Sequence, residues 1–308
     1  IKIYFNNQAN PITYSFLSNI SLIFFGDNYA SYRLFSLLGG SLLLISLLAY
    51  RNFFLITIVG LNPLIWIYSG RAYSDIISVG IMMIALETCR NGFFKGLFGI
   101  FAAILKYHSI VVSGAFWVST WLEKIIKQKS LNLRDKNLLA GVICFFGLFA
   151  FFLLYYQEFG VWILPEKFKT TFNYNNALNN FFSYGSFLAG MFFLTIPFHF
   201  KNFNWRWQLA AFIISLPLAT FNQNKGEMDF GSFNQLIGIE IIFLIKIIGF
   251  WNFILCCKLF WKDEKSRILL LTVLIYIIII SFTRPVQRYL IFVIPFWSIM
   301  ICMRLEIQ

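Results

Sequence analysis

Long apolar runs separated by short polar loops dominate the pattern of this chain. Residues 41–49, 268–280 and 290–303 carry apolar side chains on every helical face and lack the apolar–polar alternation of a membrane β-strand. A run of about 15–25 apolar residues is long enough to cross the hydrocarbon core of a bilayer. The pattern therefore predicts an all-α polytopic membrane protein.

Eleven segments of the chain have this apolar character. They are residues 30–49, 53–68, 73–89, 93–105, 109–122, 138–156, 181–198, 207–221, 236–260, 268–282 and 288–304. Residues 12–25 mix serines and an asparagine with large apolar side chains, which favours a helix lying along the membrane interface. We therefore expect a bundle of about ten to eleven transmembrane helices with one interfacial helix on the outer face.

The chain shows no soluble domain, internal repeat or low-complexity linker, so residues 1–308 are expected to form one transmembrane domain. Its first residue is Ile1 instead of Met, and no charged segment with a short apolar core precedes the first helix. We expect the chain to be incomplete at its amino end, with at least one membrane helix and one loop missing.

The basic residues give the chain a net charge of +12, and their positions indicate its orientation. If the loop at residues 123–137 is cytoplasmic, most of the 25 lysines and arginines lie in loops on that same side, as the positive-inside rule requires. Such loop positions are typical of contact with membrane lipids, and we expect no nucleic-acid partner. The smaller set of basic residues on the opposite face stands at helix ends, where an anionic lipid headgroup could bind.

The polar stretch at residues 68–75 interrupts the apolar pattern most sharply. Arg71 and Asp75 lie four residues apart, between the apolar runs 53–67 and 76–86. In one continuous helix they would share a face and could form an ion pair that fixes the helix start. Ionisable residues this close to membrane-length apolar sequence also indicate a functional site, in which Arg71 binds phosphate and Asp75 orients it or a sugar hydroxyl.

Further candidates lie at the same predicted outer level. Lys106 and His108 stand at a break between two short apolar segments, and such a break at membrane depth must face protein or a wet cavity. Arg288, before the last span, could clamp a phosphate. Glu227 and Asp229, in the polar loop 222–235, could bind a sugar or act as a base, although the sequence favours a plain solvated loop there.

Metal chemistry finds no support in the sequence. The chain has two histidines and five cysteines, and the cysteines lie in or beside apolar segments without the spacing of metal ligands. We interpret them as small apolar packing residues. No Gly-rich phosphate loop or nucleophile motif is present either, so no metal and no cofactor are expected.

Several short motifs, taken in order, resemble the GT-C superfamily of glycosyltransferases, which includes the protein O-mannosyltransferase and aminoarabinose-transferase-like families. In that family a His-Pro-Pro-Leu-like start is followed by an interfacial helix, a Phe-Gly turn and an Arg-Leu-x-Ser span. The matching residues here are 10–14, 24–27, 32–36, 62–64, 68–74, 106–108 and 288–290. The resemblance covers residues 10–110 and extends to the rest only in general layout.

This resemblance implies a membrane enzyme that transfers a sugar from a polyprenyl-phosphate donor to a lipid, glycan or protein acceptor, building cell-envelope glycan. It implies a bacterial inner membrane and an active site on the non-cytoplasmic face. The family's catalytic base is an aspartate upstream of the first motif, hence upstream of Ile1, and Asn10 replaces the family's histidine. Asp75, Glu227 and Asp229 are the remaining candidates within the chain. Arg71, Lys106, His108 and Arg288 are the expected lipid-phosphate ligands.

Two other functions fit the same pattern. A Wzy/EpsG-type polysaccharide polymerase also spans the membrane many times and places arginines and a histidine at the outer face. A transporter or flippase for lipid-linked sugars would carry inverted repeats and helices broken at the midplane, which the sequence does not display clearly. An upstream outer loop with an aspartate would favour the transferase over both alternatives.

Overall fold

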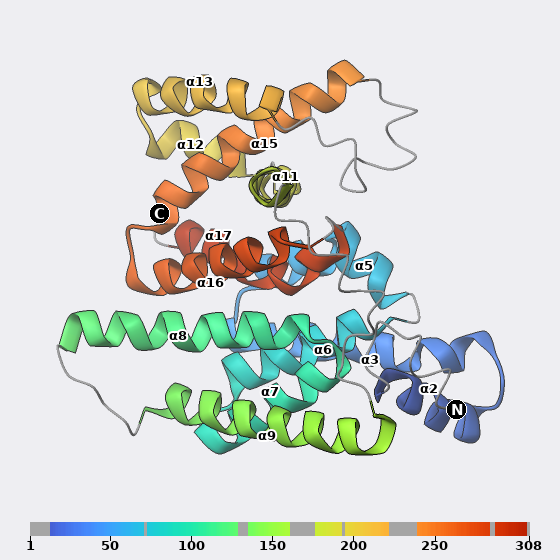
Figure 1. The fold of residues 1–308 in the computed structure, drawn as a ribbon. Coiled ribbons are helices and arrows are strands. Elements are labelled where there is room, and N and C mark those ends of the chain that lie inside the picture. Colours follow the sequence, from blue (N-terminus) through green and yellow to red (C-terminus); the bar gives the residue numbers. More distant parts are fainter. Residues whose placement is uncertain are drawn as a thin grey trace. The chain divides into compact units, whose positions relative to one another are not determined.

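The computed structural model describes residues 13–70, 73–128, 135–160, 176–192, 195–221, 239–283 and 287–306. Helices make up the regular structure of these ranges, and no strand occurs in them (Figure 1). The predicted all-α class is thus confirmed for the described part of the chain. Residues 1–170 with 291–298 form one compact unit, and residues 171–290 with 299–308 form a second. The expected single functional domain stays a prediction.

Four of the described helices are long and apolar enough to cross a membrane, judged by length and composition. They lie at Tyr29–Tyr50, His108–Lys127, Lys136–Glu158 and Phe243–Phe260. An α-helical membrane protein is therefore supported, but the described residues do not contain the expected ten to eleven spans. Several predicted spans are broken or shortened, and the breaks have local causes.

The segment predicted at residues 53–68 consists of two short helices, α4 (Phe53–Gly60) and α5 (Pro63–Ser69). Asn62 ends the first and caps the second, because its side chain accepts the Leu64 N–H while Pro63 fills the first helical turn. The segment predicted at 73–89 is α6 (Ser74–Met83) followed by a π-helical turn (Ile84–Thr88). The last predicted span is a 3-10 turn (Gln287–Phe292) followed by α17 (Ile294–Glu306).

The first unit is built around a row of packed helices. α3 (Tyr29–Leu47) packs on α6, α6 packs on α7 (Gly92–Leu105), and α7 packs on α9 (Lys136–Phe159). α8 (His108–Gln128) lies beside α7 and α9, and α2 (Thr13–Phe25) packs on α3 (Figure 1). α3 and α6 cross at Gly39 and Gly80, where an added Cβ would overlap backbone atoms of the other helix. The absence of side chains at these two positions permits the close crossing.

The second unit contains α11 (Ala177–Gly190), α12 (Ile196–Asn202), α13 (Trp205–Phe221), α15 (Ile239–Phe260) and α16 (Glu264–Ser281). α15 is its central helix, because it packs on α11, α13 and α16. Gly249 of α15 allows this approach, since a Cβ there would meet the backbone of Ser186 on α11. The side chain of Asn180 on α11 donates to the carbonyl oxygens of Ser281 and Thr283 at 2.9 and 3.0 Å, which fixes the end of α16.

Candidate functional site

Asp75 and Lys106 form a buried ion pair in the first unit. Asp75 is the second residue of α6, where the positive end of the helix dipole favours a carboxylate. Lys106 ends α7 in an extended conformation. Its Nζ lies 3.7 Å from Asp75 Oδ1, and the two side chains are 7% and 1% exposed. Two predicted site residues 31 positions apart in the chain are thus brought together inside the unit.

The Asp75 carboxylate retains unused hydrogen-bonding capacity. Within the described residues, neither of its two oxygens accepts a hydrogen bond, although both are buried. A buried carboxylate that is paired at 3.7 Å, without a hydrogen bond from the described residues, is costly, and this makes the pair a candidate for a functional role. The oxygens could accept a hydrogen bond from a donor such as a sugar hydroxyl.

Lys106 and Tyr107, which connect α7 to α8, and His108, the first residue of α8, contact three different partners. Lys106 reaches Asp75, and the ring of Tyr107 contacts Phe152 of α9 with a centroid separation of 6.0 Å. The half-buried imidazole of His108 stacks on Phe292 with centroids 5.6 Å apart. The Ser109 hydroxyl donates to the Lys106 carbonyl at 2.9 Å and holds this turn together. The predicted break between two short apolar segments is therefore a tight turn with a cation in the core.

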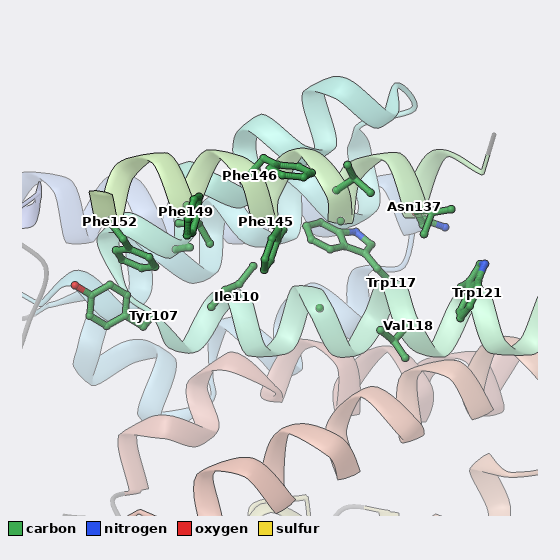
Figure 2. A pocket seen from close by; sticks show the side chains of 16 residues that line it. Tyr107, Ile110, Trp117, Val118, Trp121, Asn137, Phe145, Phe146, Phe149 and Phe152 are labelled. Carbon is green, nitrogen blue, oxygen red and sulfur yellow. The ribbon is translucent and has the colours of Figure 1, made fainter. Parts of the chain in front are cut away.

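An apolar groove of about 930 Å³ runs between α8 and α9 from this turn. Figure 2 shows Tyr107 and Phe152 at one end and Trp121 with Asn137 at the other. Trp117 lies between them and is 4% exposed, yet its indole N–H has no hydrogen-bond acceptor among the described residues. Phe145 and Phe146, which also line the groove, are more than 60% exposed. The groove is thus an aromatic, mostly apolar trough that begins one residue from Lys106.

A hydroxyl network fixes the start of α6 and hence the position of Asp75. The Tyr14 and Ser36 hydroxyls are 2.8 Å apart. Ser36 Oγ donates to the Tyr73 carbonyl at 2.9 Å and accepts the Tyr73 N–H at 3.1 Å. These bonds tie α2 and α3 to the residue before α6, two positions from Asp75.

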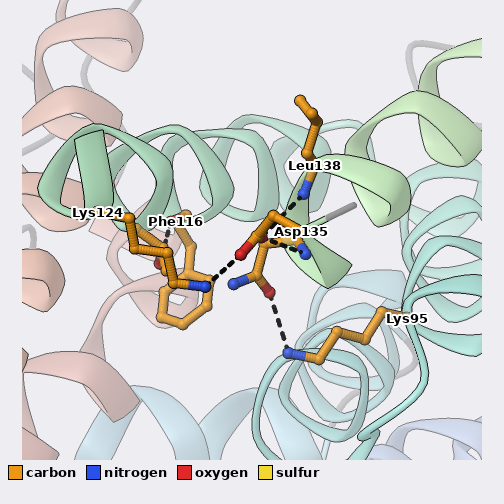
Figure 3. A network of polar contacts seen from close by, with 7 residues as sticks. Lys95, Phe116, Lys124, Asp135 and Leu138 are labelled. Atoms are coloured by element: carbon orange, nitrogen blue, oxygen red, sulfur yellow. Dashed lines mark hydrogen bonds and ion pairs between the residues drawn. The ribbon is translucent and has the colours of Figure 1, made fainter. Parts of the chain in front are cut away.

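A second polar cluster lies where α9 begins (Figure 3). Asp135 caps α9 by accepting the N–H groups of Asn137 and Leu138 at 2.8 and 3.3 Å, and it forms an ion pair with Lys124. Lys95 of α7 donates to the Asn137 side chain at 3.2 Å. Partial burial acts to raise the pKa of the Asp135 carboxyl, but the hydrogen bonds from Lys124 and the α9 backbone outweigh burial and hold the pKa below its ordinary value.

A buried polar network in the second unit was not predicted. His199 Nε2 lies 2.6 Å from Asn252 Oδ1, and Thr195 donates to the same oxygen at 2.9 Å. The Cys256 thiol is 3.5 Å from that oxygen and 3.8 Å from His199 Nε2. The available signal was a pair of polar residues four apart in each of two segments, Thr195 with His199 and Asn252 with Cys256. The sequence alone favours Cys256 as a small apolar packing residue, whereas in the structure its thiol also belongs to this polar network.

The remaining predicted site residues are placed only in part. Arg71, Glu227 and Asp229 lie outside the described residues, so the expected Arg71–Asp75 pair does as well. Arg288 belongs to the second unit, and its guanidinium carbon lies 5.6 Å from the centroid of the Tyr289 ring. No group of three or more His, Cys, Asp or Glu side chains that could hold a metal ion occurs in the described part of the chain.

Comparisons of the chain with protein-family models, with curated proteins and with solved structures found no match.

Proposed function

We propose that this chain is a membrane glycosyltransferase that takes a sugar from a polyprenyl-phosphate-linked donor and transfers it to a lipid, glycan or protein acceptor. The observation that carries the proposal is the buried Asp75–Lys106 pair, one residue from the end of the apolar groove. A cation one residue along the chain from Tyr107, which lines the end of the apolar groove, would suit an amphiphilic substrate with a phosphate at one end and a hydrocarbon chain behind it. The motifs that resemble the GT-C superfamily agree with this assignment.

The chemistry assigns a role to each residue of the site. As the bond between the sugar carbon and the phosphate oxygen breaks, its electron pair passes to the phosphate, which leaves with more negative charge. Lys106 would stabilise that charge, and an N–H of His108 would donate to a phosphate oxygen. The acceptor hydroxyl forms the new bond to the sugar carbon and loses its proton to a carboxylate base. Asp75, being 1% exposed, is proposed to position Lys106.

The membrane arrangement that we propose keeps the site on the non-cytoplasmic face of a bacterial inner membrane. α2 has 13 residues, about 20 Å of helix, which is too short to span a bilayer. Its Phe16, Ile23 and Phe24 side chains are 61%, 80% and 76% exposed, which supports an interfacial helix. We retain a GT-C-like bundle as the architecture to which this helix would belong.

Sugar transfer in liposomes, from a polyprenyl-phosphate-linked donor to a lipid acceptor, tests this function. The protein should contain any upstream loop. We expect Lys106→Gln to lower turnover by about 10²–10³-fold, as for removal of one charge-stabilising donor in other enzymes. Lys201→Gln, an exposed lysine on α12, is the matched control and should retain full turnover. If wild-type protein instead elongates lipid-linked oligosaccharide, it is a polymerase; if it moves the donor across the bilayer without forming a bond, it is a flippase.

Substitutions at Asp75 separate positioning from direct catalysis. Asp75→Glu keeps the charge that holds Lys106 and should recover part of the turnover that Asp75→Asn loses. Because Asp75 acts through Lys106, we expect the loss in kcat with little change in KM. If Asp75 were itself the base, kcat of the wild-type protein would fall at acidic pH as Asp75 is protonated. The residual kcat of Asp75→Asn would then lack that fall.

The role of the groove can be tested by filling it. Gly114 of α8 lines the groove, and beyond its chain neighbours and its own helix backbone no described residue lies within 4 Å of a Cβ built there. Gly114→Trp should raise KM for a long polyprenyl donor by at least tenfold while sparing a short-chain analogue. Gly190→Trp is the control, because Gly190 also has open space but lies at the end of α11 in the second unit. Equal effects on both donors would show that the groove does not hold the chain.

A further inference from the structure

A strongly basic surface lies where α15 ends and α16 begins, in the second unit. Lys258, Lys262, Lys265 and Arg267 fall within ten residues. Of the two acids in the same segment, Asp263 is already engaged, since it accepts the Ser266 N–H at 2.9 Å and pairs with Arg304 at 3.2 Å. The excess of cations makes this surface complementary to an anionic ligand.

Aromatic side chains surround these cations. Trp205, Trp207 and Trp261 are 68%, 51% and 52% exposed. The Lys258 ammonium lies over the Trp207 ring, and the Lys262 ammonium is 5.9 Å from the centroid of Phe203. Exposed tryptophans interleaved with lysines are typical of the headgroup level of a membrane, where their rings are half in hydrocarbon and half in water.

A pocket of about 480 Å³ opens between α15 and α16 beneath these charges. Leu270 and Leu274 of α16 form one wall, and Cys257 with Lys258, Trp261 and Lys262 of the α15 end form the other. The methylene stems of the two lysines can line an apolar wall while their ammonium groups stay at the rim. The pocket therefore combines an apolar interior with a cationic entrance.

We propose that this pocket binds an anionic glycerophospholipid. Lys258 and Lys262 contact the phosphate, and one acyl chain lies along Leu270 and Leu274. A free phosphate would use the lysines but not the apolar interior, and a neutral lipid would use the interior but not the excess charge. All residues of this pocket belong to the second unit, whereas Asp75 and Lys106 of the proposed transferase site belong to the first.

Native mass spectrometry of the full chain in neutral detergent tests the proposal with two lipids of identical acyl chains, phosphatidylglycerol and phosphatidylcholine. We expect wild-type protein to retain phosphatidylglycerol preferentially. Lys258→Gln with Lys262→Gln should reduce its affinity for that lipid about tenfold or more, because each lysine near an anionic lipid contributes measurably. Lys127→Gln with Lys136→Gln removes two exposed lysines from the first unit and should leave the affinity unchanged.

Leu274→Trp provides a test that does not alter charge. By filling the pocket, it should weaken phosphatidylglycerol binding while every lysine remains, and it also decides the case if the double lysine variant fails to fold. Equal retention of both lipids by wild-type protein overturns the proposal. So does a loss of phosphatidylglycerol affinity in the Lys127/Lys136 control that equals the loss in the Lys258/Lys262 variant. Displacement of the lipid by excess inorganic phosphate, with no effect of Leu274→Trp, would mean that the surface binds phosphate alone and would also overturn it.

Discussion

Asp75 and Lys106 form an ion pair in the protein interior, and burial changes how much that ion pair contributes to stability. Two charges taken out of water lose hydration that their attraction recovers only with good geometry and further hydrogen bonds. Here the Asp75 oxygens accept no hydrogen bond among the described residues, and the ion-pair distance is 3.7 Å. Such a pair is poorly explained by stability alone, which is the physical reason for placing it in a functional site.

Removing one partner of this pair should cost more than removing both. Asp75→Ala removes the carboxylate that pairs with the buried Lys106 ammonium, and we expect a loss of about 3–5 kcal/mol in the free energy of unfolding. Asp75→Leu combined with Lys106→Met should recover most of that loss, because an apolar pair of similar volume replaces the two charges. Urea unfolding in mild detergent measures both, with Asp27→Asn in the exposed turn after α2 as the control. If the loss of stability in the double variant equals the sum of the losses in the two single variants, the two residues do not act as a coupled pair.

Asp135 links the stability of the first unit to pH. Its pKa is depressed in the folded protein, so its contribution is present above the unfolded pKa of about 3.9 and is lost as pH falls through the lower folded value. Asp135→Asn can still cap α9 but cannot titrate. We expect the wild-type unfolding temperature to fall more steeply than that of the variant as pH drops below about 4. Parallel pH profiles for the two proteins would contradict this linkage.

At the scale of single residues, the sequence indicated Asp75, Lys106 and His108 because a charge or a break among apolar residues is visible without a structure. It did not indicate which charges pair, because the partner of Asp75 comes from the end of another helix. The Thr195–His199–Asn252–Cys256 network was missed for a related reason. Its members come from two separate segments of the chain, and the sequence does not show that His199 lies against Asn252 and Cys256 of α15.

At the scale of elements, apolar length predicted more spans than the described helices provide. Composition alone treats residues 53–68 as continuous, whereas Asn62 and Pro63 end one helix and begin another. Local capping chemistry therefore overrides hydrophobic length at this position. The helix starts at Asn28, Asn52 and Asn91 follow the same rule, since each side chain accepts a backbone N–H of the first turn.

The crossing of α3 and α6 depends on two residues without side chains. Gly39→Ala would place a Cβ onto the backbone of Ile77, so the two helices must separate and lose buried contacts. We expect a loss of about 1–3 kcal/mol in the free energy of unfolding, or more if the helices cannot adjust. Gly190→Ala is the matched control, because among the described residues nothing beyond its chain neighbours and its own helix backbone lies within 4 Å of its Cβ position. A neutral Gly39→Ala variant would show that the crossing is looser than described.

At the scale of the whole molecule, the distribution of basic residues gives an orientation that packing alone cannot give. The four candidate spans define helix ends, but their length and composition do not indicate which end lies on the cytoplasmic side of the membrane. The basic residues between α8 and α9 provide that direction through the positive-inside rule. The orientation therefore rests on sequence and stays a prediction.

Labelling of single cysteines with a membrane-impermeant maleimide tests this orientation. In a variant without the five native cysteines, Asp27→Cys should react from the non-cytoplasmic side, because it lies just before the span that begins at Tyr29. Lys127→Cys, at the end of α8, should react only after the membrane is opened. The reverse pattern would invert the proposed topology and move the Asp75–Lys106 pair to the cytoplasmic face.

The length of α7 has a consequence for the surrounding bilayer. Its 14 residues rise about 21 Å, against a hydrocarbon thickness of about 30 Å. The phenylalanines at positions 93, 94, 98 and 101 are exposed along this helix. If α7 crosses the membrane, as its apolar sequence predicts, lipids beside it would have to shorten or tilt to match its length, at an elastic cost that grows with the length of their acyl chains. The first unit would then thin the bilayer locally, and thicker membranes would resist that thinning more strongly.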